Sequence, residues 1–362
     1  MQSEPMASKN KVLRPAIIVS HRIISEYSTY LEHLIVGLAD ESIPIALVCP
    51  ADSNVDQLIS GGVQVIEHPL IDLPLMERLG RNSLLEQLEK FKPTVLHCLC
   101  QSKAQLTSWL ARRLSLPYVL MVDSLRPYRI SSFLSFKSCA RIYVPAGSIA
   151  TNLSKIYPYL ADRIVQINMG AFLDDHTLCF SEPSFLATMV MAHPLINAVD
   201  FENIFAALKH LKIDNYEFML AIMGKGHAEE RVWRLLSALD LTESITVVPH
   251  LRPLRSVLAA GDIFIQPQPN QTFNPILLEA MSVGTAVAAC KGGVDDLILP
   301  DKTAVVFDPD DQISIRSALQ RLLDGRDFAR QLARSTQQYV RENHSVSSMI
   351  SAILQMYNEV QT

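Results

Sequence analysis

Short apolar runs rich in β-branched residues alternate along this chain with stretches that have the period of a helix. The apolar runs have the character of buried parallel strands and lie at residues 16–20, 45–49, 63–67, 94–98, 118–122 and 141–144. The stretches between them place apolar residues three and four apart, at residues 27–39, 84–91 and 104–114. Alternating strands and helices predict a parallel sheet covered on both faces, with right-handed crossovers.

The same alternation starts again in the second half of the chain. Strands are predicted at residues 187–191, 217–223, 245–248, 263–265, 286–289 and 304–307. Helices are predicted at residues 200–210, 227–239, 252–260, 275–283 and 311–323. We therefore predict an α/β fold of two facing, doubly wound parallel-sheet (Rossmann-like) domains, at residues 12–170 and 171–342. The last helix, at residues 343–362, is expected to pack back on the first domain.

Composition excludes several classes of protein. A net charge of −5 and an isoelectric point near 6.1 give no basic surface for nucleic acid. No run approaches the ~20 apolar residues of a membrane-spanning helix, and residues 1–11 lack the apolar run of a signal peptide. Cys98 and Cys100 alternate on a predicted strand and fit neither a zinc site nor a redox pair. We expect buried, reduced thiols, no metal site and a cytoplasmic location.

One segment carries a resemblance to a known family. Residues 271–297 read QTFNPILLEAMSVGTAVAACKGGVDDL. This resembles the signature of the retaining GT-B glycosyltransferases of family four, in which two Glu are separated by seven residues and a Gly-Gly turn follows. Further matches occur in order at residues 161–170, 222–226, 259–268 and 301–308. The resemblance implies the GT-B fold and transfer of a sugar from a nucleotide-sugar donor, with retained configuration, no metal and no cofactor.

By this resemblance, four residues of the second domain bind the donor nucleotide. Glu279 would accept hydrogen bonds from the ribose, since a carboxylate offers two oxygens to a vicinal diol; a first-turn Glu favoured by the helix dipole is the alternative. Gly224 and Gly226 would let the backbone approach the phosphates, or form a plain strand-to-helix turn. His193 stands where the family has an Arg. Protonated beside a phosphate it would supply a cation, and the alternative is an ordinary loop histidine.

The loop before the predicted helix at residues 275–283 departs from the family pattern. Gln271 stands at the position of the first Glu, facing the donor sugar, and is one of two expected catalytic residues. Its neutral amide can position a hydroxyl but cannot stabilise a developing positive charge by its own charge. Phe273, Asn274 and Ile276 occupy the stretch whose backbone N–H groups meet the donor's sugar and phosphate. Pro275 has no N–H to give, although proline also favours the first position of a helix.

The first domain departs from the family as well. The family's glycine-rich loop after the first strand is replaced by residues 20–26, SHRIISE, predicted to be a glycine-free loop. Asp123 is the second expected catalytic residue and would bind a sugar hydroxyl. The alternative is a strand-end Asp that caps the next turn. The family's Arg and Lys for the diphosphate are both absent here, so convergence of Arg22, His193 or Arg252 in the cleft would favour an active enzyme by supplying a replacement cation.

Two classes of function remain open from the sequence. The first is an active transferase with a nucleotide-sugar donor and a glycan, lipid-linked or small-molecule acceptor. The second is a catalytically silent GT-B module that binds a nucleotide sugar, a glycan or a partner transferase, because the departures gather in one cleft. The basic and aromatic residues at 124–141 have two possible explanations. They make peripheral contact with the inner face of a membrane, or they form a half-buried helix whose basic edge is solvated.

Overall fold

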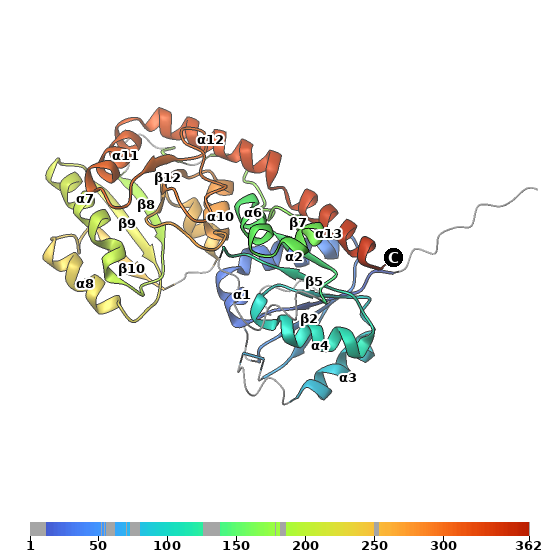
Figure 1. The fold of residues 1–362 in the computed structure, drawn as a ribbon. Coiled ribbons are helices and arrows are strands. Elements are labelled where there is room, and N and C mark those ends of the chain that lie inside the picture. Colours follow the sequence, from blue (N-terminus) through green and yellow to red (C-terminus); the bar gives the residue numbers. More distant parts are fainter. Residues whose placement is uncertain are drawn as a thin grey trace, which may run out of the picture.

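The computed structural model describes residues 12–51, 53, 55, 62–69, 71–72, 80–125, 138–177, 179–181, 186–249 and 253–361. The chain forms two parallel sheets, each with its own helices, that lie beside one another (Figure 1). The last two helices run from the second sheet back to the first (Figure 1). The predicted α/β fold of two doubly wound domains is confirmed.

The N-terminal sheet has seven parallel strands in the order β3-β2-β1-β4-β5-β6-β7. The strands are β1 (Pro15–Ile18), β2 (Ile45–Cys49), β3 (Val63–Glu67), β4 (Val95–Cys98), β5 (Tyr118–Met121), β6 (Arg141–Val144) and β7 (Ile164–Gln166). The order reverses between β1 and β4. The loops that follow these two strands diverge at such a switch point and leave a crevice at the carboxyl edge of the sheet.

Helices connect these strands in the N-terminal domain. They are α1 (His21–Glu26), α2 (Ser28–Asp40), α3 (Arg81–Phe91), α4 (Ala104–Leu114) and α6 (Gly147–Ile156), with short 3-10 helices η1 (Gln101–Lys103) and η2 (Pro158–Arg163). The predicted loop at residues 20–26 is wrong, because most of it forms α1. The His21 N–H at the start of this helix donates to Asp72 Oδ2 at 2.8 Å, so a distant carboxylate satisfies an otherwise unpaired group.

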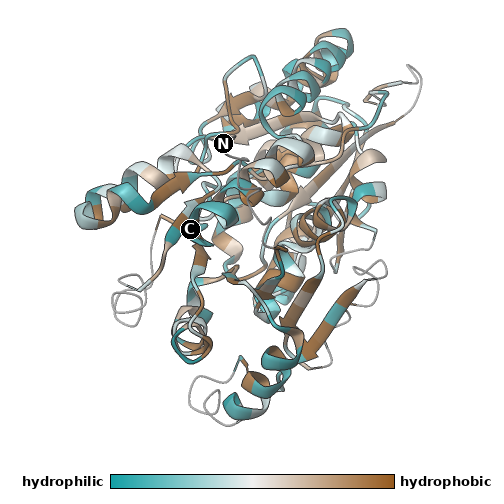
Figure 2. Cartoon of the chain, turned by 90° about the vertical axis from the view of Figure 1, so that its right-hand side faces the viewer, coloured by the Kyte–Doolittle hydropathy of each residue, from teal (hydrophilic) through white to brown (hydrophobic). Residues whose placement is uncertain are grey.

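The C-terminal sheet has six parallel strands in the order β10-β9-β8-β11-β12-β13. The strands are β8 (Ala187–Ala192), β9 (Phe218–Met223), β10 (Ile245–Val248), β11 (Ile263–Gln266), β12 (Ala286–Cys290) and β13 (Val305–Phe307). The helical elements are η3 (Ala198–Phe201), α7 (Glu202–Ile213), α8 (Glu229–Ala238), α9 (Leu254–Ala259), α10 (Pro275–Val283), α11 (Gln312–Asp324), α12 (Arg326–Asn343) and α13 (Val346–Gln361). In Figure 2 the strands are mostly brown and the helices mix brown with teal, as buried strands and amphipathic helices require.

The chain passes between the two domains at two places that lie side by side. Ala171, on the way to the C-terminal domain, pairs with Ser345, on the way back, and the Ala171 N–H donates to the His344 carbonyl at 2.9 Å. A Cβ on Gly170 would lie 2.6 Å from the Val346 Cα, so only glycine allows this approach. Helix α13 then packs against α2. The returning C-terminal helix is therefore where the sequence predicts it.

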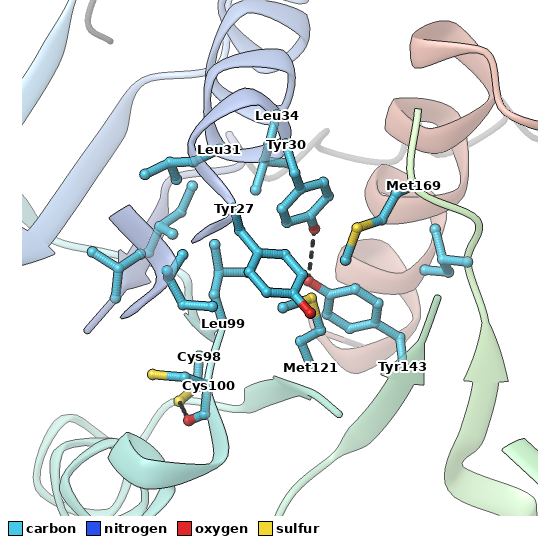
Figure 3. Close-up of a cluster of buried hydrophobic side chains, with 14 of the residues drawn as sticks. Tyr27, Tyr30, Leu31, Leu34, Cys98, Leu99, Cys100, Met121, Tyr143 and Met169 are labelled. Atoms are coloured by element: carbon cyan, nitrogen blue, oxygen red, sulfur yellow. Dashed lines mark hydrogen bonds between the residues drawn. The ribbon is translucent and has the colours of Figure 1, made fainter. Parts of the chain in front are cut away.

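A buried chain of polar groups joins this last helix to the N-terminal sheet. His97 on β4 hydrogen-bonds Tyr357 on α13 through Nδ1 at 2.5 Å and Tyr143 on β6 through Nε2 at 2.8 Å. The Tyr143 hydroxyl also bonds that of Tyr30 on α2 at 2.9 Å (Figure 3). Burial lowers the pKa of His97 to about 3, so the ring is neutral and one nitrogen donates while the other accepts.

Two further expectations concern thiols and membranes. All six cysteines are free and buried, as predicted. Cys100 lies beyond the end of β4, so the prediction that Cys98 and Cys100 alternate on one strand is wrong; the Cys98 thiol donates to the Cys100 carbonyl at 3.0 Å. Among the described helices, none combines the length and the apolar character needed to span a membrane. Most of the basic and aromatic segment at 124–141 lies outside the described residues.

Candidate active site

The loops at the carboxyl ends of β5 and β11 meet between the domains. Ser124 and Thr272 form an antiparallel bridge. The Leu125 N–H donates to the Gln271 carbonyl at 2.9 Å, and the Phe273 N–H donates to the Asp123 carbonyl at 2.8 Å. The two residues expected to be catalytic, Gln271 and Asp123, are thereby brought together on one strip of backbone that joins the domains.

The Asp123 carboxylate forms an ion pair with Arg22, the second residue of α1. Arg22 Nη2 donates to Asp123 Oδ2 at 2.6 Å, and Arg22 Nη1 lies 3.3 Å from Glu26 Oε2. Asp123 is 2% exposed, whereas the Arg22 side chain is 37% exposed. The carboxylate therefore does not cap the next turn, which was one reading of the sequence. A buried carboxylate needs such a partner to stay ionised.

A pocket of about 490 Å³ opens beside this pair. It is formed by loops from both domains, and its walls are Ser20, His21, Arg22, Asp72, Cys100, Gln101, Ser102, Asp123, Ser124 and Thr272. All of these except Thr272 belong to the N-terminal domain and follow the carboxyl ends of β1, β4 and β5 or lie close to them in space. The pocket thus occupies the switch point of the N-terminal sheet.

Glu279 lies in a second pocket, of about 560 Å³, between α2, α9 and α10. It is 2% exposed and its Oε1 accepts a hydrogen bond from Arg255 Nη1 at 2.5 Å. Arg255 Nη2 also donates to Asp174 in the linker at 2.7 Å, and its side chain is 28% exposed. Oε2 of Glu279 accepts no hydrogen bond from the described residues. Because α10 begins at Pro275, Glu279 is in the second turn, so the first-turn dipole alternative is wrong.

The N-terminus of α10 is capped from within the chain. Asn274 Oδ1 accepts the N–H groups of Ile276 and Leu277, both at 3.1 Å, and Pro275 fills the first helical position. The Phe273 N–H is used by Asp123, and the Phe273 carbonyl accepts from the Tyr27 hydroxyl at 2.9 Å. Of the backbone donors expected to meet a donor sugar and phosphate, the N–H groups of Phe273 and Ile276 are therefore already engaged in this structure.

Behind this cap, one buried donor at the end of β11 lacks a partner. Gln266 is 3% exposed, and its Oε1 accepts a hydrogen bond from Asn274 Nδ2 at 3.0 Å. Its Nε2 makes no hydrogen bond to the described part of the chain. An unpaired buried amide costs on the order of 1–3 kcal/mol, so this polar group is an unusual feature of the α10 end of the cleft.

Gly224 and Gly226 are explained by packing against the loop after β8. A Cβ at either position would lie 2.1 Å from a backbone carbonyl oxygen, of His193 and Leu195 respectively. The parallel pairing of β8 with β9 continues through this loop, since the Leu195 N–H donates to the Lys225 carbonyl at 3.1 Å. The two glycines are required by this close approach whether or not a phosphate binds there.

His193 lies beside an acid at the start of the C-terminal domain. Its Nε2 lies 3.4 Å from Asp200 Oδ2, and its ring packs edge-on to Phe201. Burial lowers the pKa of His193, and Asp200 only partly opposes this effect. The ring is therefore mainly neutral near pH 7. Arg252 lies outside the described residues, and Arg22 is bound to Asp123.

Sequence reasoning missed Arg255. The residue falls on a predicted helix, at residues 252–260, but nothing in its period shows that it meets a carboxylate 24 positions later. In the structure, Arg255 lines the pocket that contains Glu279.

The sequence of this chain is similar to those of known glycosyltransferases. Residues 186–339 match the family model described as glycosyl transferases group 1. The sulfoquinovosyl transferase SQD2 of Arabidopsis thaliana is 23% identical over 269 residues, 67% of this chain and 52% of the relative. A D-inositol 3-phosphate glycosyltransferase of Salinispora tropica is 30% identical over 34% of this chain and 26% of the relative. The matched region thus spans about half or less of these relatives.

Solved structures match over nearly the whole chain. A glycosyltransferase from Rickettsia africae superposes with a TM-score of 0.80 at 16% identity, covering 96% of this chain and 98% of the other. Anabaena HepE in complex with UDP and glucose superposes with a TM-score of 0.78 at 12% identity, covering 96% and 99%. Likeness at this identity concerns the fold. The chain therefore has the GT-B fold, and within it residues 186–339 match the glycosyl transferases group 1 model.

Proposed function

We propose that this chain transfers a sugar from a nucleotide-sugar donor to an acceptor hydroxyl, with retained anomeric configuration and without a metal ion. The observation that carries the proposal is the position of Glu279: it lies on α10 of the family-matched domain, buried, and lines an interdomain pocket of about 560 Å³. Structures of Anabaena HepE, which shares the fold, hold UDP or UDP-glucose. These complexes favour a nucleoside diphosphate sugar as the donor class.

The proposed reaction replaces one bond to the anomeric carbon by another. The acceptor oxygen bonds to that carbon, the bond from the carbon to the nucleotide's phosphate oxygen breaks, and its electron pair leaves with the phosphate. The acceptor proton passes to the departing phosphate. Gln271 and Asp123, on the strip where the domains meet, are proposed to position the donor sugar and the acceptor hydroxyl.

Arg255, which was not predicted as a site residue, also has a role in this proposal. Glu279 Oε2 accepts no hydrogen bond from the described residues, so a ribose hydroxyl can bind there while Oε1 stays with Arg255. Arg255 is 28% exposed in the same pocket and binds Asp174 as well as Glu279. We propose that it holds Glu279 in position for the ribose, because Glu279 and Asp174 both bind its guanidinium.

A catalytically silent module is the second candidate, and a specific observation favours it. His193 is mainly neutral, the N–H groups at the start of α10 are capped by Asn274, and Glu279 is bound to Arg255. A site in which these groups are paired internally must give up some of those pairs to admit a ligand, which lowers its affinity. Such a module would bind a glycan or a partner transferase instead.

Calorimetric titration of UDP, GDP, ADP and their common sugar conjugates separates the two candidates. The proposal expects one nucleotide sugar to bind with micromolar affinity and Glu279→Gln to weaken binding by about tenfold or more, the loss of one good charged hydrogen bond. Glu86→Gln is the matched control, since Glu86 is exposed on α3 and should leave binding unchanged. If no nucleotide binds more tightly than the millimolar range, the silent module is favoured.

A further inference from the structure

The pocket at the switch point of the N-terminal sheet has a charge balance that restricts its ligand. Arg22 is bound to Asp123 at 2.6 Å, and the buried Lys103 is bound to Asp72 at 3.1 Å. Arg22 has a further acidic neighbour in Glu26, at 3.3 Å. Arg22, which lines the pocket, and Lys103, which binds the pocket residue Asp72, are therefore each neutralised by a carboxylate. A phosphate or sulfate group is normally held by cations that have no such partner.

Uncharged polar groups make up most of the remaining wall. Ser20, Ser102, Ser124 and Thr272 contribute hydroxyl groups and Gln101 contributes an amide. Hydroxyls and amides can both donate and accept hydrogen bonds, which is also true of the hydroxyls of a sugar or polyol. The Thr272 hydroxyl makes no hydrogen bond to the described residues. It comes from the C-terminal domain, one residue after Gln271, and pairs with Ser124 at the wall of the pocket.

The size and position of the pocket agree with an acceptor site. About 490 Å³ falls within the ~300–1,000 Å³ of ordinary small-molecule sites. The pocket stands at the carboxyl edge of one sheet and is closed by a loop from the other domain, so a molecule bound there faces the strip formed by Asp123 and Gln271.

We propose that this pocket binds an uncharged, hydroxyl-rich acceptor, a neutral sugar residue or polyol, in preference to a phosphorylated one. The proposal deepens the proposed function and rests on it, since an acceptor needs a donor across the cleft. In it, the paired Arg22 and Asp123 shape a neutral polar wall, and Thr272 contacts an acceptor hydroxyl directly.

Ligand-observed NMR titration tests this with two matched pairs of probes: glucose with glucose 6-phosphate, and myo-inositol with myo-inositol 1-phosphate. Each is measured with and without the nucleotide found by calorimetry. At least one neutral member should bind about tenfold more tightly than its phosphorylated partner. Thr272→Val should weaken that binding about three- to tenfold, the loss of one hydrogen bond. Thr151→Val, on an exposed face of α6, should leave it unchanged.

A variant that adds charge provides the opposite test. Thr272→Arg places a cation without a partner at the pocket and should reverse the preference within a pair towards the phosphorylated member. Tighter binding of a phosphorylated probe to the wild-type protein overturns the proposal. So does the failure of both neutral probes to bind in the presence of nucleotide. Neither result bears on the donor site, which is tested separately by the nucleotide titration with Glu279→Gln. If no nucleotide binds in that titration, the transferase proposal is rejected, and any sugar binding belongs to a silent module.

Discussion

Each domain presents to the cleft one carboxylate that is 2% exposed and paired with a partly exposed arginine. In the N-terminal domain Arg22 meets Asp123 at 2.6 Å, and in the C-terminal domain Arg255 meets Glu279 at 2.5 Å. The two pairs differ in their second acid. Glu26 is one turn from Arg22 on the same short helix, whereas Asp174, bound by Arg255, belongs to the linker between the domains.

This difference separates a local pair from one that connects distant parts of the chain. The Arg22 pair neutralises charge within one domain. The Arg255 pair ties α9, α10 and the linker together, so a ligand that draws Glu279 or Arg255 away also acts on the linker. Similar ion pairs at the two sides of one cleft can thus serve different purposes, which the following predictions examine.

Removal of the two arginines gives the largest expected contrast. Arg255→Met leaves Glu279 buried without a partner and should lower the free energy of unfolding by about 3 kcal/mol. Arg22→Met should cost less, about 1–2 kcal/mol, because its side chain is more exposed and water can reach the carboxylate. Urea unfolding measures both. The double variant Arg255→Met with Glu279→Gln should recover part of the loss, and equal losses for the two single variants would remove the distinction.

Packing at the glycines gives a second contrast between the domains. Gly226→Ala should destabilise the protein by about 2 kcal/mol, because the new Cβ lies 2.1 Å from the Leu195 carbonyl oxygen, which is backbone and cannot move easily. Gly147→Ala, at the start of α6, is the control. Its Cβ would meet only side-chain oxygens, at 3.3 and 3.4 Å, so thermal unfolding should show little change. Similar melting temperatures for both variants would contradict the packing account.

Acid should affect the N-terminal domain through His97. Its pKa is lowered by burial to about 3 in the folded protein and lies near 6.5 in the unfolded chain, so the unfolded state binds more protons between these values. The contribution of His97 to stability is complete above about pH 6.5 and falls with decreasing pH, by up to about 1.4 kcal/mol per pH unit.

Urea unfolding at several pH values measures this slope, and His97→Gln should flatten it. His193 on the C-terminal side provides the comparison, since burial also lowers its pKa but Asp200 partly opposes the effect. Proton NMR should show the pKa of the His193 ring lowered from its ordinary value. A His97 signal that titrates near pH 6 would show that the buried chain of hydroxyls opens readily.

Helix capping gives the smallest contrast. Asp311→Ala removes the cap of α11, where Oδ1 accepts the Ile313 N–H at 2.8 Å, and should cost about 1 kcal/mol. Asn274→Ala at the cleft should cost somewhat more, because it also removes the hydrogen bond from Nδ2 to Gln266 Oε1. Chemical unfolding distinguishes them, and an equal cost would mean that the Gln266 contact contributes nothing.

The architecture was predictable because it depends on local period. The helices at residues 104–114 and 275–283 were predicted to the residue, and the break before the last helix falls where expected. Strand β7 was missed since it is short and two of its three residues are exposed. Helix α1 was missed because the carboxylate that satisfies its first N–H, Asp72, lies 51 residues away.

The candidate site was less predictable, for a related reason. Motif spacing located Glu279, Gln271 and Asp123 in the sequence and the fold brings the last two together, but the partner of each carboxylate is a tertiary contact. Neither Arg255 with Glu279 nor Arg22 with Asp123 could be read from period or spacing. Gly224 and Gly226 show the converse case, because a motif that implied a ligand is also explained by a neighbouring loop.

The hydrogen bond between His97 and Tyr357 has a consequence for biosynthesis. It links residues 260 positions apart, and Tyr357 is fully buried against the N-terminal domain. Domains made first on the ribosome often fold first, yet this domain cannot complete its core until residue 357 has been translated. The apolar surface of α2 that α13 finally covers is therefore exposed to solvent throughout elongation. A nascent chain with such a surface is a natural client for chaperones.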